Sequence, residues 1–91
     1  MKIGVIGLGL IGGSFAISAK KLISPSKLFG NDKNSDNENK ALELGLIDEI
    51  LKESDFFKMD VILIAIPVDA ALELVNDLLD RINNNTLLIF L

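Results

Sequence analysis

Residues 3–14 constrain the fold of this chain more than any other segment. A short β-branched run at residues 3–6 is suited to a buried strand, and it leads directly into Gly7, Gly9 and Gly12 at the spacing G-x-G-x-x-G. An amphipathic stretch with helical spacing follows without a break. Strand, glycine-rich turn and helix in this order are typical of the loop that binds the pyrophosphate of a dinucleotide. The sequence therefore predicts a dinucleotide site near the start of the chain.

The three glycines have separate roles in such a loop. Gly7 permits the tight turn out of the strand, Gly9 leaves room for the pyrophosphate, and Gly12 lets the helix lie close against the sheet. Backbone amides in this segment are expected to point at the phosphates, with the positive end of the helix dipole behind them. The alternative is a turn with a structural role only. The cofactor-binding candidates in the loop are Gly7, Gly9, Leu10, Ile11 and Gly12.

An acidic residue, Asp32, lies twenty positions beyond Gly12, at the end of a second predicted strand that begins at Lys27. In dinucleotide-binding folds a carboxylate at about this distance accepts hydrogen bonds from the adenosine ribose hydroxyls. It would also repel the additional phosphate of NADP, so Asp32 favours NAD as the cofactor. Lys33 weakens that preference, because a base beside the ribose would help to accommodate a 2′-phosphate. The alternative is that Asp32 is an ordinary turn residue.

The composition narrows the classes of protein to consider. The chain has 91 residues, of which 49% are hydrophobic and 24% are charged, and this fits one small globular domain. The formal net charge is -4 and Lys20–Lys21 is the only adjacent pair of basic residues, so we expect no nucleic-acid partner. Cys and His are both absent from the sequence. The absence of Cys excludes disulfides and Cys-based metal sites or catalysis, and we predict no metal site within the chain.

Membrane association and secretion are not expected either. No apolar run reaches the roughly 18 residues that a membrane-spanning helix needs. The N-terminus leads directly into the first predicted strand, without the features of a signal peptide. We therefore expect a cytoplasmic protein with no membrane partner.

Three segments carry helical patterns. The first helix is expected over residues 10–22. A second helix begins at Ser35, where Glu38 would reach back to complete a capping box. Asp69 is expected to cap the last helix, in which apolar residues form one stripe. The polar residues of that helix, mostly on the opposite side, are Glu73, Asn76, Asp77, Asp80 and Arg81.

Five apolar segments are predicted to contain strands, and they alternate with the helices. They are residues 3–6, 27–32, 46–51, 61–66 and 86–91. Right-handed crossovers convert this order into an α/β fold, a Rossmann-type doubly wound parallel sheet with strand order 3-2-1-4-5. The nucleotide would lie across the carboxyl ends of the first and fourth strands. Because the chain ends with the fifth strand, we expect residues 1–91 to form a partial NAD-binding domain, truncated after that strand.

Three motifs are narrower than the generic fingerprint. Residues 7–14 read Gly-Leu-Gly-Leu-Ile-Gly-Gly-Ser, residues 41–49 read Ala-Leu-Glu-Leu-Gly-Leu-Ile-Asp-Glu, and residues 65–69 read Ala-Ile-Pro-Val-Asp. With these motifs the chain closely resembles the prephenate and arogenate dehydrogenases of tyrosine biosynthesis. The resemblance implies an NAD-dependent oxidoreductase that converts prephenate to 4-hydroxyphenylpyruvate by oxidative decarboxylation. It also implies that Pro67 and Val68 border the cofactor, the alternative being that Pro67 only ends its strand.

The same resemblance implies that the chain alone is inactive. In the family the catalytic histidine and a helical substrate and dimerisation domain lie downstream of the fifth strand, so we expect both to be absent from residues 1–91. Self-association as a homodimer is instead expected through the last strand, whose apolar edge is unpaired. Two alternative functions remain, an NAD-sensing regulatory module and another NAD(P)-dependent dehydrogenase of the same fold. The motifs do not distinguish prephenate from arogenate as the substrate.

Overall fold

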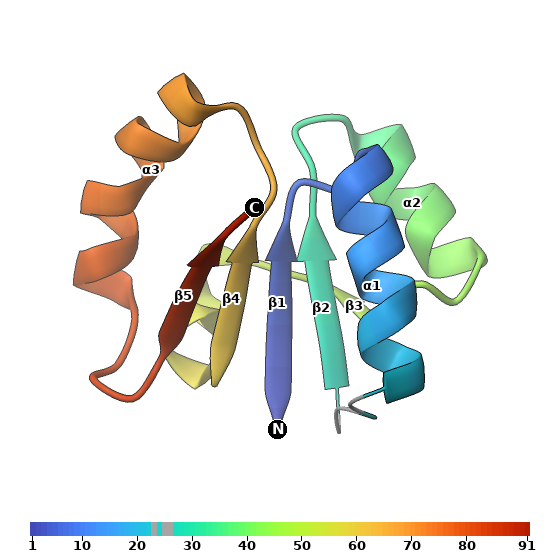
Figure 1. The fold of residues 1–91 in the computed structure, drawn as a ribbon, viewed down its shortest axis with the longest axis horizontal. Helices are drawn as coiled ribbons and strands as arrows, with labels where there is room; N and C mark the ends of the chain where they lie inside the picture. Colours follow the sequence, from blue (N-terminus) through green and yellow to red (C-terminus); the bar gives the residue numbers. More distant parts are fainter. Residues whose placement is uncertain (23, 25–26) are drawn as a thin grey trace.

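The structure is a computed structural model that describes residues 1–22, 24 and 27–91, without the side chains of residues 10 and 11. Its parallel strands form one sheet in the order β3-β2-β1-β4-β5, which confirms the predicted topology (Figure 1). The strands are β1 (Lys2–Ile6), β2 (Lys27–Asn31), β3 (Glu49–Ile50), β4 (Val61–Ile64) and β5 (Leu87–Phe90). The helices are α1 (Leu10–Leu22), α2 (Ser35–Glu43), the short 3-10 helix η1 (Glu53–Lys58) and α3 (Val68–Arg81). None of the helices in the described ranges is long and apolar enough to cross a bilayer.

β1 is the central strand of the sheet, and most of its residues are buried. It pairs with β2 on one side and with β4 on the other. Residues 3–6 of this strand are all buried. A parallel strand that is covered by helices on both faces needs such an apolar run, so the local sequence and the central position agree.

Each face of the sheet has its own apolar core. The core under α1 and α2 consists of Ile3, Val5, Ala16, Leu28, Ala41, Ile47 and Leu63. The core under α3 and η1 consists of Ile6, Phe29, Leu51, Phe56, Met59, Ile62, Ile64, Ala71 and Leu78. Small residues, Ala16 in α1 and Ala41 in α2, let these helices approach the sheet closely. The helices thus cover the faces, and the carboxyl ends of the strands form one edge of the molecule (Figure 1).

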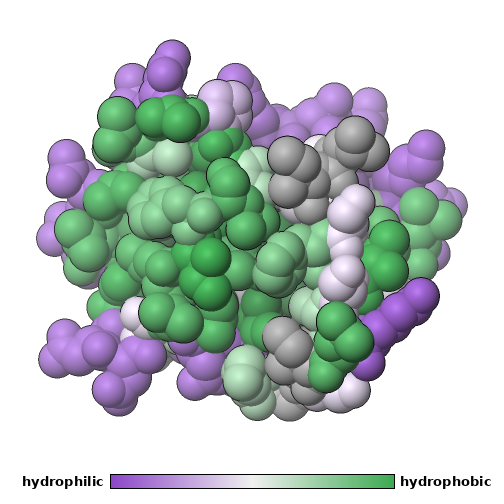
Figure 2. All heavy atoms as spheres, in the orientation of Figure 1, coloured by the Kyte–Doolittle hydropathy of each residue, from purple (hydrophilic) through white to green (hydrophobic). Residues whose placement is uncertain are grey.

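Apolar side chains are also exposed on the surface. Figure 2 shows them gathered over the half of the molecule that carries α3 and β5. The large exposed apolar residues of these two elements are Val68, Leu72, Leu79, Leu87 and Phe90. β5 is the last strand of the sheet on this side, so its outer edge adjoins this apolar surface.

The start of α2 differs from the predicted capping box. Asn34, rather than Ser35, is the N-cap, and its side chain accepts a hydrogen bond from the Asp36 amide at 2.8 Å. Glu38 does reach back, but its carboxylate accepts a hydrogen bond from the Asp32 amide at 3.0 Å. Asn caps a helix as effectively as Ser. The shift by one residue therefore brings the Glu38 carboxylate to the end of β2.

The start of α3 differs as well. The helix begins at Val68 with Pro67 as its N-cap, so the prediction that Asp69 is the cap is wrong. Proline has a fixed φ and no N–H, and both properties suit the start of a helix. Asp69 lies two residues after the cap, in the first turn, where its negative charge interacts favourably with the positive end of the helix dipole.

Candidate functional site

Gly7 forms the turn out of β1 in a backbone conformation that other residues avoid. Its φ is +98°, and its amide donates a hydrogen bond to the Asn31 carbonyl at the end of β2, 2.9 Å away. A Cβ at this position would overlap with the carbonyl oxygen of Ala65, just after β4. Both the backbone conformation and the packing therefore require glycine here.

Gly12 and Gly9 are glycines for opposite reasons. A Cβ on Gly12 would overlap with the carbonyl oxygen of Gly7, so the first turn of α1 packs directly against the glycine turn. A Cβ on Gly9 would meet no described atom within 4 Å. Packing therefore does not explain the glycine at position 9, whereas a ligand that lies close to the backbone would explain it.

The Asp32 side chain joins the glycine loop to the end of β2. Its Oδ2 accepts a hydrogen bond from the Leu8 amide at 2.8 Å, and its Oδ1 accepts one from the Asn34 amide at 2.9 Å. An ionised carboxylate has about four lone-pair sites. Asp32 therefore keeps acceptor capacity for a ligand while it holds the loop in place.

The glycine loop and Asp32 border one cleft at the carboxyl ends of the strands, with a volume of about 690 Å³. Four of the predicted site residues line this cleft, namely Gly7, Gly9, Asp32 and Pro67. They come from three loops that follow β1, β2 and β4. The parallel sheet brings these loops together because the carboxyl ends of its strands share one edge.

Of the other four predicted site residues, Gly12 and Val68 are not in the described lining of the cleft. Gly12 is buried behind the glycine turn, and Val68 is 72% exposed at the start of α3. Leu10 and Ile11 begin α1, and their side chains lie outside the described part of the chain. The first amides of a helix have no intrahelical partner. A ligand would therefore reach these two residues through the backbone.

One wall of the cleft is absent from the sequence prediction. It is formed by α3, and its residues are Ala70, Glu73, Leu74 and Asp77. Their spacing of i, i+3, i+4 and i+7 marks a single helix face, beginning three residues after Pro67. That spacing was the available signal, but charged residues at such positions more often face solvent than a cleft. Asn37 of α2, which also lines the cleft, gives no comparable signal.

The cleft combines three kinds of contact. The start of α1 and the open position at Gly9 suit an anionic group, and the Asp32 carboxylate suits hydroxyl groups as donors. Apolar side chains, Ile66 and Leu74, suit a flat ring. The lining contains more carboxylates than lysines, so a phosphate would be held by backbone amides and not by side-chain charge. This combination fits a nucleotide better than a simple anion.

Comparisons with known sequences find one family. A sequence model described as prephenate dehydrogenase, nucleotide-binding domain, matches residues 15–90. A curated relative, the prephenate dehydrogenase of Lactococcus lactis subsp. cremoris (strain MG1363), is 38% identical over 80 residues. The aligned part covers 85% of this chain and 22% of that protein.

Comparisons with solved structures find similar proteins. The arogenate dehydrogenase of Synechocystis has a TM-score of 0.89 and 28% identity, and the match covers 100% of this chain and 32% of that chain. The prephenate dehydrogenase of A. aeolicus, in complex with hydroxyphenyl propionate and NAD+, has a TM-score of 0.88 and 25% identity. That match covers 99% of this chain and 32% of the other. The chain thus spans about a third or less of the length of these relatives.

Proposed function

The chain belongs to the family of prephenate dehydrogenase nucleotide-binding domains, and on this basis we propose that it binds NAD in the cleft at the carboxyl ends of β1, β2 and β4. The observation that carries the proposal is the open position at Gly9, in the same cleft as the Asp32 carboxylate. The A. aeolicus relative of the same fold holds NAD+. The family match begins at residue 15 and so excludes the glycine loop, which supports the proposal independently.

Each part of the cleft would hold a different part of the cofactor. The pyrophosphate would lie over Gly9, against the amides of Leu10 and Ile11 at the positive end of α1. The Asp32 carboxylate would accept hydrogen bonds from the ribose hydroxyls. It would use the lone pairs that are not engaged by the Leu8 and Asn34 amides. Pro67, with Val68 beside it, would border the cofactor on the β4–α3 loop.

For the longer protein we propose the family reaction. Prephenate and NAD+ would give 4-hydroxyphenylpyruvate, CO2 and NADH, a step of tyrosine biosynthesis. NAD supplies the hydride acceptor when it is bound. The residues of this chain would hold and orient it, as part of an NAD-binding domain that further chain completes. Arogenate is the alternative substrate, because one solved relative is named arogenate dehydrogenase. A cytoplasmic location is part of the proposal, since the NAD pool that such an enzyme would use lies inside the cell.

Calorimetric titration of the 91-residue chain with NAD tests the binding site. The Gly9→Val substitution would place a Cβ in the open position, where it meets no described atom within 4 Å. The Kd for NAD should therefore rise at least about tenfold, with little change in the melting temperature. Gly13→Ala is a control close by in the sequence that should bind NAD normally, because its Cβ would lie 3.8 Å from the nearest described atom, the Leu8 carbonyl oxygen. Normal binding by the Gly9→Val variant would show that the loop is structural only.

Two further measurements test cofactor choice and activity. The wild-type chain should bind NAD more tightly than NADP, and the reverse order would overturn the role of Asp32. The chain alone should not form NADH from prephenate. General acid–base catalysis contributes roughly a hundred- to ten-thousand-fold in rate, and these 91 residues contain no histidine for it. NADH formation in proportion to the purified chain would refute the expected inactivity.

A further inference from the structure

A second cavity lies near the amino ends of β1 and β2, away from the glycine loop, with a volume of about 360 Å³. Four lysines line it, namely Lys2, Lys27, Lys52 and Lys58. Lys2 and Lys27 begin β1 and β2 and are register partners in the sheet. Lys52 and Lys58 stand at the two ends of η1. Four of the nine basic residues therefore line one cavity of a chain whose net charge is -4.

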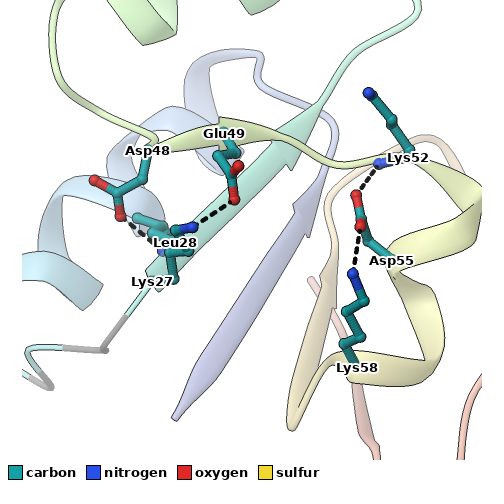
Figure 3. Close-up of polar contacts among 7 residues, drawn as sticks. All are labelled: Lys27, Leu28, Asp48, Glu49, Lys52, Asp55 and Lys58. Atoms are coloured by element: carbon teal, nitrogen blue, oxygen red, sulfur yellow. Dashed lines mark hydrogen bonds and ion pairs between the residues drawn. The ribbon is translucent and has the colours of Figure 1, made fainter.

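The two carboxylates in the cavity lining are already engaged. Glu49 forms an ion pair with Lys27, with 2.9 Å between Oε2 and Nζ. Asp55 Oδ2 accepts a hydrogen bond from the Lys52 amide at 3.0 Å, and its Oδ1 forms an ion pair with Lys58 Nζ at 3.5 Å (Figure 3). Two carboxylates against four lysines leave the cavity with a formal charge of +2.

The excess positive charge resides on Lys2 and Lys52. Within the described ranges, neither of their ammonium groups takes part in an ion pair. Figure 3 shows why for Lys52, whose backbone amide holds Asp55 while its side chain extends away from that carboxylate. Like charges that line one cavity repel each other, and an anion placed between them relieves this repulsion.

We propose that this cavity binds a small dianion of the oxyanion class, a phosphate ester or a dicarboxylate. Its volume equals that of roughly twelve waters at about 30 Å³ each, enough for inorganic phosphate or a four-carbon dicarboxylate. Lysine ammonium groups bind such ligands as point charges, and the Ser54 hydroxyl in the lining supplies a further donor. None of these residues lines the NAD cleft, so the proposal does not depend on NAD binding.

Amide NMR spectra of the 91-residue chain, recorded during titration, test the proposal. The probes are sodium phosphate and disodium succinate, with sodium chloride at matched ionic strength as the reference. Amide signals of Lys2, Lys27 and residues 50–55 should shift and saturate with phosphate, succinate or both, and the outcome identifies the ligand class. Shifts that chloride reproduces, or that never saturate, would overturn the proposal. NAD should instead shift residues 7–13, so the two sites are tested separately.

Two variants that remove the same charge distinguish anion binding in the cavity from attraction by the net charge of the chain. Lys52→Gln should weaken binding of the saturating anion about fivefold, the loss expected when one negative charge of the ligand lies about 4 Å from one ammonium group in water. Lys40→Gln removes the same charge from the exposed surface of α2, outside the cavity, and should leave the affinity unchanged. Equal weakening by both variants would show that the whole chain, and not this cavity, attracts the anion.

Discussion

The Asp32 carboxylate accepts a hydrogen bond from the Leu8 amide, with 2.8 Å between the two atoms. This bond fixes the end of β2 against the glycine loop, the two segments that the proposal assigns to the ribose and the pyrophosphate. The second carboxylate oxygen holds the Asn34 amide at the start of α2. One side chain therefore serves both the architecture of the loop and its proposed ligand.

Substitution can separate these two functions of Asp32. Asp32→Ala removes both acceptors and leaves the partly buried Leu8 amide and the exposed Asn34 amide without them. The free energy of unfolding should fall by about 1–3 kcal/mol, mostly because of the Leu8 amide. Asp32→Asn keeps one acceptor oxygen and should cost less stability, yet both variants should bind NAD more weakly. Urea denaturation and calorimetry measure the two effects. Equal stability of all three proteins would contradict the role of Asp32 in holding the loop.

The glycines of the loop should respond differently to the same substitution. Gly12→Ala forces a methyl group against the Gly7 carbonyl oxygen, so α1 has to move and the free energy of unfolding should fall by at least about 2 kcal/mol. Gly9→Ala adds a methyl group in open space and should change stability by less than about 1 kcal/mol. Urea denaturation of both variants decides this. A Gly12→Ala protein as stable as wild type would show that the contact between α1 and the turn is loose.

The sheet order could be predicted because strands and helices alternate strictly and crossovers have one hand. The position of Asp32 beside the loop could be predicted because it depends on the same βαβ geometry. The cap of α2 could not be predicted, since Asn34 and Ser35 are equally good caps. The hydrogen bond between Glu38 and Asp32 depends on how α2 packs beside β2, which the local sequence does not determine. The α3 wall of the cleft was missed because Asp77 fits an exposed helix face equally well, and it does pair with Arg81 there.

Asp48 connects three segments on the side of the sheet away from α3. Its Oδ2 accepts the Leu28 amide of β2 at 2.8 Å, and its Oδ1 pairs with Lys20 of α1 at 3.2 Å. Lys20 also donates to the Gly45 carbonyl at 2.7 Å. The bond from the Leu28 amide lowers the pKa of Asp48 below its usual value of 3.8, with help from Lys20 and against partial burial.

Ionised Asp48 should therefore stabilise the fold above pH 3.8, and this stabilisation is lost as the pH falls through the pKa of the folded state. Asp48→Asn should lower the free energy of unfolding by about 1 kcal/mol at neutral pH, a modest effect because solvent screens a side chain that is 39% exposed. The deficit should shrink below pH 3.8. Urea denaturation as a function of pH tests this, with the exposed Asp80→Asn as control. A deficit that grows in acid would contradict the assignment.

The outer edge of β5 is open to a second chain. The Leu87 amide donates to the Asp60 carbonyl just before β4, and the Leu91 amide donates to the Ile64 carbonyl at the end of β4. Peptide groups alternate in direction along a strand. Leu88 and Phe90 therefore direct their N–H and C=O groups to the free edge. Charged residues and proline usually protect an edge strand from pairing with another chain. β5 contains neither. Antiparallel pairing about a two-fold axis at Ile89 would satisfy these groups in both copies.

We expect the 91-residue chain to self-associate in this way, driven by burial of apolar side chains at roughly 25 cal/mol per Å². Light scattering should show a mass that rises with concentration towards that of a dimer. Leu87→Lys is a suitable probe because Leu87 is 56% exposed. A charge at Ile89 would disturb the fold as well, since Ile89 packs on the core. Leu44→Lys, at the end of α2 and 63% exposed, should leave association unchanged. A wild-type chain that stays monomeric, or a dimer that survives the Leu87→Lys substitution, would reject this interface.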